Sequence, residues 1–149
     1  MNIADILPVD AIVPDMKALS QTGVFEELIA PLVALHPDLQ DQALVKALCE
    51  REMLGSTAIG EGVAIPHGKV AGLENVLLAV GRSITGVDFD APDSKPCQIF
   101  FLILAPEHGA GMHLKLLAQI ARRAKDPVFR SEIMLASGAD QIRHAFTAP

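Results

Sequence analysis

One apolar run in the second half of the chain limits the possible folds more than any other feature. From Cys97 to Leu104 the sequence reads CQIFFLIL, and glutamine is the one polar residue in it. A strand buried on both faces reads as a continuous apolar run, whereas a half-buried strand alternates. The run therefore predicts a central strand in a sheet that other elements cover on both sides.

Helical patterns on both sides of this run supply the cover. Pro31 is predicted to kink or break the helix expected over residues 20–35, and Asp38 is a plausible N-cap for the helix expected over residues 39–54. The spacing predicts helices over residues 20–35, 39–54, 111–125, 127–136 and 139–146, and extended pieces over 11–13, 57–59, 63–65 and 76–80. Strands mixed with helices predict a single-domain α/β/α sandwich over residues 1–149, a mixed β-sheet flanked by helices on both faces.

Composition excludes several classes of function. Half of the residues are hydrophobic, so a core can form without disulfides. The net charge of −6, the pI near 5.2 and the lack of Trp and Tyr disfavour nucleic acids and anionic membranes as partners. Cys49 and Cys97 are far apart and predict free thiols in a reducing compartment. There is no basic segment followed by an apolar leader, and no run is long enough to cross a bilayer, so a cytoplasmic location without membrane insertion is expected.

The segment from Gly55 to Lys69, GSTAIGEGVAIPHGK, carries the strongest functional signal. It places four glycines around one Pro-His pair, and glycine permits positive φ and close approach of another molecule. Pro66 fixes the backbone just before His67. A neutral imidazole held in this way can accept a phosphoryl group on a lone-pair nitrogen and later release it.

Other residues are candidates to assist such a step. His113 opens the helix predicted from residue 111, where unpaired N–H groups favour negative charge. Arg51 lies near the end of an earlier helix, where it either neutralises charge or holds the glycine-rich segment from behind. An apolar rim is expected from Ile65, Pro66 and Met112. Donors that could cradle the phosphoryl oxygens are Ser56, Thr57 and the backbone near Gly68.

Metal and nucleotide chemistry fit the sequence poorly. His67, His108 and His113 have neither HxH nor HExxH spacing, so no metal or cofactor is expected. The aspartates of residues 88–93 lack the glycine and glutamate spacing of a calcium loop, and turn formation is their expected role. The glycine-rich segment also lacks the GxxxxGK[ST] pattern of a phosphate-binding loop.

Two long motifs carry a family resemblance. Residues 51–70, REMLGSTAIGEGVAIPHGKV, resemble the signature of IIA proteins of the fructose/mannitol class of the bacterial phosphotransferase system. Residues 105–130, which include HLKLLA, are similar to the second landmark of that class. The wording of both motifs, and a chain without a fused carrier or membrane domain, are most similar to the nitrogen-regulatory branch.

The resemblance implies a phosphoryl relay from phosphoenolpyruvate through an enzyme I homologue and an HPr-like phosphocarrier (NPr) to His67. It implies an assisting role for His113, and Arg51 matches the arginine of the family motif. Nε2 of His67 (the tele nitrogen) is the candidate acceptor, although the sequence does not decide which ring nitrogen is phosphorylated. Such a protein acts as a carrier more than as a turnover enzyme, and its expected partners include regulators of potassium transport or nitrogen metabolism. Two alternatives stay open: a sugar-specific IIA component that passes phosphate to a IIB domain, and an unphosphorylated binding module of the same fold.

Overall fold

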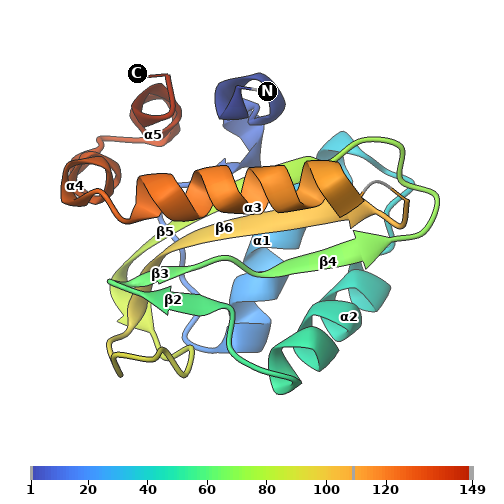
Figure 1. The fold of residues 1–149 in the computed structure, drawn as a ribbon, viewed down its shortest axis with the longest axis horizontal. Helices are drawn as coiled ribbons and strands as arrows, with labels where there is room; N and C mark the ends of the chain where they lie inside the picture. The colour runs from blue at the N-terminus through green and yellow to red at the C-terminus, as the bar shows by residue number, and fades with distance from the viewer. Residues whose placement is uncertain (1, 109, 148–149) are drawn as a thin grey trace.

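The chain folds around one mixed sheet. The computed structural model describes residues 2–108 and 110–147. The 3₁₀-helices are η1 (Ile3–Ile6) and η2 (Val9–Ala11), the strands are β1 (Ile12–Val13), β2 (Ala58–Gly60), β3 (Val63–Ala64), β4 (His67–Val70), β5 (Leu77–Val87) and β6 (Cys97–Pro106), and the α-helices are α1 (Gln21–Leu35), α2 (Asp41–Met53), α3 (Ala110–Ala124), α4 (Pro127–Leu135) and α5 (Ala139–Ala145). The α/β sandwich predicted from the sequence is confirmed (Figure 1).

Strand order follows β1-β5-β6-β3-β2, and β4 pairs with β6 beyond β3. The β5–β6 and β2–β3 pairs are antiparallel, whereas β1 pairs with β5, and β3 and β4 pair with β6, in parallel. β6, the strand predicted from the apolar run, thus has neighbours on both sides. Ile99 to Ala105 are all buried, as expected for a strand covered on both faces.

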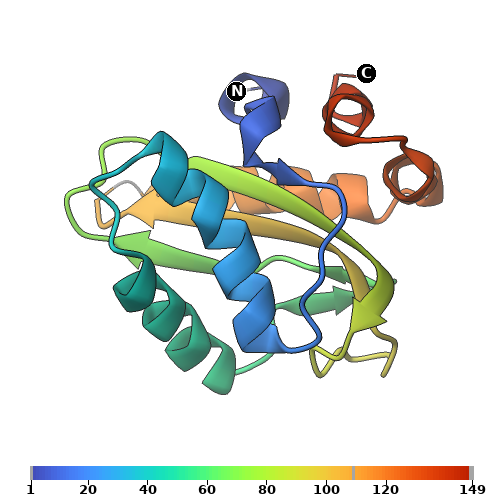
Figure 2. The same ribbon diagram turned by 180° about the vertical axis from the view of Figure 1, so that it is seen from behind.

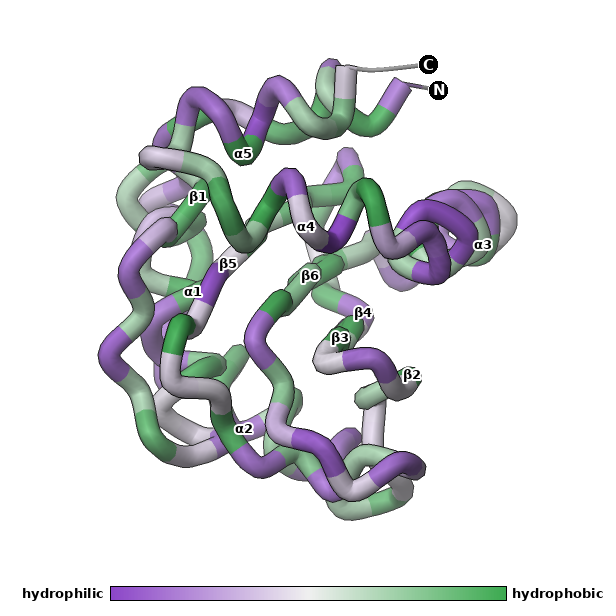
Figure 3. The backbone as a smooth tube through the Cα atoms, turned by 90° about the vertical axis from the view of Figure 1, so that its left-hand side faces the viewer, coloured by the Kyte–Doolittle hydropathy of each residue, from purple (hydrophilic) through white to green (hydrophobic). Residues whose placement is uncertain are grey.

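The helices form two layers. Figure 2 shows α1 and α2 on the face of the sheet opposite α3, and Figure 3 shows the same arrangement along the strands, with α1 and α2 on one side of the row of strands and α3 on the other. Ser20 caps α1 by accepting the N–H of Gly23 at 3.1 Å. The buried faces of these helices are Val24, Phe25, Leu28, Ile29 and Leu32 on α1, Leu44 and Leu48 on α2, and His113, Leu116, Ile120 and Ala124 on α3.

The N-cap predicted for the second helix is wrong, and the break predicted as one outcome at Pro31 does not occur. α2 begins at Asp41 with Gln40 as its N-cap, and Asp38 lies in the preceding turn, which the N–H of Leu39 closes on the carbonyl of His36. α1 continues through Pro31 without a break. Proline removes one backbone donor from the helix, and the buried apolar face of α1 extends across this position.

Close packing of α1 on β5 makes Gly81 sensitive to substitution. A Cβ at Gly81 would lie 2.8 Å from Cδ2 of Leu28 and closer still to Sδ of Met16. We expect Gly81→Ala to lower the free energy of unfolding by about 1–3 kcal/mol because the core must shift to admit a methyl group. Urea denaturation checks this. Gly111→Ala is the matched control, since no described atom lies within 4 Å of its added Cβ; it should be neutral or stabilising by up to about 1 kcal/mol, and equal losses would contradict the packing argument.

Candidate functional site

The first residue of β4 is His67, which the sequence placed in a glycine-rich loop. β3 ends at Ala64, and the carbonyl of Pro66 accepts the N–H of Ile103 at 3.0 Å, which begins the β4–β6 pairing. The imidazole of His67 is half-buried, and its Nδ1 lies 2.8 Å from the carbonyl oxygen of Ile65. A carbonyl only accepts hydrogen bonds, so Nδ1 carries the proton in the neutral ring. Nε2 is then the nitrogen with the lone pair.

His113 lies beside His67, although 45 residues of sequence separate them. It belongs to the first turn of α3 and is 7% exposed. The two ring centroids are 5.3 Å apart and the rings meet edge to face at 80°. The structure therefore brings the two predicted histidines together at the start of a helix, where the backbone dipole favours an anion.

The Nε2 atom of His113 is buried without a hydrogen-bond partner among the described residues. Burial lowers the pKa of His113, and the neighbouring charges of His67 and Lys69 lower it further. A neutral imidazole with an unused nitrogen is a costly group to bury. It is also a group that is ready to hydrogen-bond a ligand held on His67.

The lowered pKa of His113 predicts a pH dependence of stability. Unfolding returns this side chain to its ordinary pKa of 6.5, so the unfolded chain binds the proton first as the pH falls. The stability is therefore complete above about pH 6.5 and declines as the pH falls from there toward the native pKa. We expect urea denaturation to give a smaller loss of stability between about pH 7.5 and about pH 5.5 for His113→Gln than for the parent protein. An NMR titration that places the His113 pKa at or above 6.5 would contradict this assignment.

Arg51 lies behind the glycine-rich segment. Its Nη1 donates to the carbonyl of Gly55 at 3.0 Å, which closes the turn that follows α2. The sequence left open whether Arg51 neutralises charge or holds the segment. The observed contact is of the second kind.

The hydroxyls proposed from sequence as phosphoryl donors have partners within the protein. Ser56 Oγ donates to the carbonyl of Phe89 and accepts the N–H of Ala58 at 3.0 Å. Thr57 is buried, and Glu52 accepts both its hydroxyl and, at 3.0 Å, its N–H. The sequence analysis missed the buried carboxylate of Glu52. The sequence indicates it only by the position of this glutamate near a helix end, five residues before a threonine.

Gly68 lies within β4 and pairs in register with Leu104. In a parallel ladder, alternate residues direct their backbone groups to the same neighbour. Pro66 directs its carbonyl to the N–H of Ile103 on β6, so Gly68, two residues later, also points its backbone groups toward β6. The outward-facing backbone groups of the strand belong to His67 and Lys69.

The apolar surroundings differ from the rim expected at sequence level. Ile65 and Pro66 are buried and form no surface, so that part of the expectation is wrong. Both side chains are buried because the segment between β3 and β4 lies in a sheet that helices cover on both faces. Met112 is 53% exposed as expected, and Leu114, on the other side of His113, is 65% exposed.

The remaining candidates do not join the histidine pair. His108 is exposed before α3, and Asp93 accepts N–H bonds from Glu61 and Lys95, which lower its pKa. Within residues 2–108 and 110–147, no group of three or more His, Cys, Asp or Glu side chains is arranged to hold a metal ion. In the same part of the chain, no helix has the length and apolar character needed to cross a bilayer.

Comparison with known proteins extends over the whole chain. The family profile described as "Phosphoenolpyruvate-dependent sugar phosphotransferase system, EIIA 2" matches residues 5–148. A nitrogen regulatory protein of Bradyrhizobium diazoefficiens is 36% identical over 149 residues, covering 100% of this chain and 97% of the relative. The fructose-specific EIIABC component of Bacillus subtilis is 32% identical over 95% of this chain, which corresponds to 22% of that larger protein.

Solved structures agree. The nitrogen regulatory protein IIA-Ntr from Neisseria meningitidis matches with a TM-score of 0.90 and 38% identity over 97% of this chain and 98% of that one. IIA mannitol from Escherichia coli matches with a TM-score of 0.76 at 17% identity, over 93% of this chain and 97% of that one, and shares the fold. The family resemblance seen in the two motifs is thereby confirmed: the chain belongs to the EIIA 2 family of the phosphoenolpyruvate-dependent sugar phosphotransferase system.

Proposed function

We propose that the protein carries a phosphoryl group on Nε2 of His67 and that its phosphorylation state regulates partner proteins. The observation that supports this is the 2.8 Å contact between Nδ1 of His67 and the carbonyl of Ile65. It fixes the proton on one nitrogen and presents the lone pair of the other. A half-buried ring with a fixed tautomer loses little freedom when a donor docks.

The transfer balances as an exchange of one P–N bond for another. The Nε2 lone pair of His67 attacks phosphorus on a phosphohistidine of an HPr-like carrier, and the P–N bond of the donor breaks with its electron pair returning to the donor imidazole. Nδ1 keeps its proton throughout. Its hydrogen bond to Ile65 stabilises the positive charge that develops on the ring.

His113 supports this step as a hydrogen-bond donor. Its buried Nε2 lacks a partner among the described residues and lies on a ring packed against that of His67. With the proton on Nε2, it donates to a phosphoryl oxygen as negative charge gathers there. Arg51, Ser56 and Thr57 act less directly, because their contacts shape the turn between α2 and β2.

We place the protein in the nitrogen-regulatory branch. A relative named as a nitrogen regulatory protein matches it at 36% identity over 97% of that relative's length, and a solved one matches at 38%. A phosphoryl group adds roughly −1.5 to −2 charges at one point, beside the exposed Met112 and Leu114. Partners that bind this apolar surface when His67 is unmodified are then repelled.

A sugar-specific IIA function is the second candidate. A fructose-specific EIIA component from Haloferax volcanii is 33% identical over 95% of this chain. The chemistry at His67 would be the same, and the acceptor would be a IIB domain. The two candidates therefore differ in their partners.

A phosphotransfer assay tests the proposal. The protein is incubated with phosphoenolpyruvate, an enzyme I homologue and HPr-like carriers of the nitrogen and sugar branches in parallel, with and without a IIB domain. We expect acid-labile, base-stable phosphate on His67, formed faster from the nitrogen-branch carrier and retained when IIB is present. NMR should detect coupling between phosphorus and Nε2. Rapid transfer to IIB would favour the sugar-specific function, and a protein never labelled by either carrier would be an unphosphorylated binding module.

A further inference from the structure

Lys69 follows His67 by two residues on β4. Side chains two apart on a strand leave it on the same face, about 6.6 Å apart along the chain. The residue between them faces the other way, since a Cβ on Gly68 would lie 3.6 Å from Cδ2 of Leu48 on α2. Lys69 therefore leaves the sheet on the face that carries His67 and α3.

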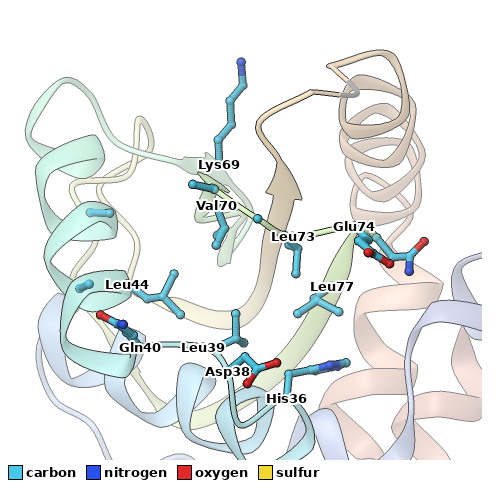
Figure 4. A pocket seen from close by; sticks show the side chains of 15 residues that line it. His36, Asp38, Leu39, Gln40, Leu44, Lys69, Val70, Leu73, Glu74 and Leu77 are labelled. Atoms are coloured by element: carbon cyan, nitrogen blue, oxygen red, sulfur yellow. The ribbon is translucent and has the colours of Figure 1, made fainter.

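The course of the Lys69 side chain relative to the opposite face of β4 can be followed in Figure 4. A groove on that side is lined by residues of α2 and of the turn before it, by Lys69 and Val70 of β4, and by residues 71–75 and Leu77. Figure 4 shows the apolar side chains of Leu44, Val70 and Leu73 in the groove, whereas the ammonium group of Lys69 points away from them. Its charged end is thus separate from this apolar lining.

The charge of Lys69 acts on His113. It is one of the influences that lower the pKa of His113, after burial and the effect of His67. Lys69 is exposed, and within the described part of the chain no hydrogen bond or ion pair holds its ammonium. Its three N–H donors are therefore available near the two rings, unlike the Nη1 donor of Arg51, which the carbonyl of Gly55 accepts.

We infer that Lys69 binds the phosphoryl group carried by His67 and so determines how firmly this protein retains it against its carrier. The inference rests on the proposed function. A lysine side chain spans the distance between neighbouring positions on one strand face, and its flexible stem lets the ammonium follow the phosphoryl oxygens. The protein as a whole is negative, with a net charge of −6, so a nearby cation offsets repulsion that would otherwise favour return to the donor.

The test is the equilibrium distribution of phosphoryl groups between the HPr-like carrier and this protein. Lys69→Gln should shift it toward the carrier by about 5-fold at low salt, the range of a single partly exposed charge pair. Lys69→Arg should restore most of the difference because it keeps the charge. The shift should shrink to under about 2-fold near 1 M salt, where charges are screened within roughly 3 Å.

Lys125→Gln is the matched control, because it removes an exposed lysine just beyond the far end of α3. It should leave the distribution unchanged. If Lys69→Gln and Lys125→Gln behave alike while both are labelled on His67, the inference about Lys69 is wrong and the proposed function stands. If the parent protein is not labelled at all, the proposed function itself fails.

Discussion

Replacing His67 with alanine is expected to abolish phosphoryl transfer to this protein. His113, the other imidazole of the site, is 7% exposed and is therefore poorly placed to accept the group in place of His67. Labelling from phosphorylated carrier should fall to background over the full time course. Native gel electrophoresis and mass spectrometry of the intact protein measure the loss.

The His67→Ala protein should remain folded. The side chain is half-buried, and its one hydrogen bond among the described residues is to the carbonyl of Ile65. The net contribution of such a bond is about 0.5–1.5 kcal/mol. His108→Ala is the control, because it removes an exposed histidine without touching the pair. Normal labelling of a folded His67→Ala protein would show that the phosphoryl group resides elsewhere.

The sequence predicted the parts of the fold that depend on apolar patterning. The run at Cys97–Leu104 identified the central strand, and its continuous apolar character required cover on both faces, which α1, α2 and α3 provide. Of the five α-helices in the described part of the chain, four begin within one residue of the predicted start. Burial determines these elements, and the periodic spacing of apolar side chains in the sequence indicates which residues are buried.

β4 shows where patterning fails. His67–Val70 contains glycine and two polar residues and has no alternation to mark a strand. It is extended because β6 offers it a parallel partner in register with Ile103 to Pro106. The start of α2 was misplaced for a similar reason: both Asp38 and Asp41 are suitable near a helix start, and the turn closed by Leu39 on His36 decides between them.

At the site, the sequence identified the reactive groups but not what holds them. His67 was identified by the glycines around it, and His113 by its position at the start of a predicted helix. The carbonyl of Ile65, which sets the tautomer of His67, is a backbone group that any residue would supply. The carboxylate of Glu52 accepts the N–H of Thr57 because the chain turns back after α2. Its role therefore becomes visible only in the fold.

His113 gives the second large expected effect, and a matched pair of substitutions isolates its hydrogen bond. His113→Leu keeps a similar size and a good helix former but removes every polar atom, whereas His113→Gln keeps an amide that can donate. We expect transfer to His67 to slow by about 100-fold or more in the leucine variant, the usual effect of losing one donor to developing charge. The glutamine variant should stay within about 10-fold of the parent. Single-turnover kinetics with phosphorylated carrier measure both rates.

Stability should move in the opposite direction to activity. The buried Nε2 of His113 has no partner among the described residues, and an unsatisfied buried polar group costs about 1–3 kcal/mol. His113→Leu removes that cost, so its free energy of unfolding should equal or exceed that of the parent protein while its transfer rate collapses. A residue that destabilises the protein when its polar atom has no partner, but is required during transfer, is retained for its chemistry. Leucine and glutamine variants that transfer at the same rate as the parent would leave His113 as a packing residue only.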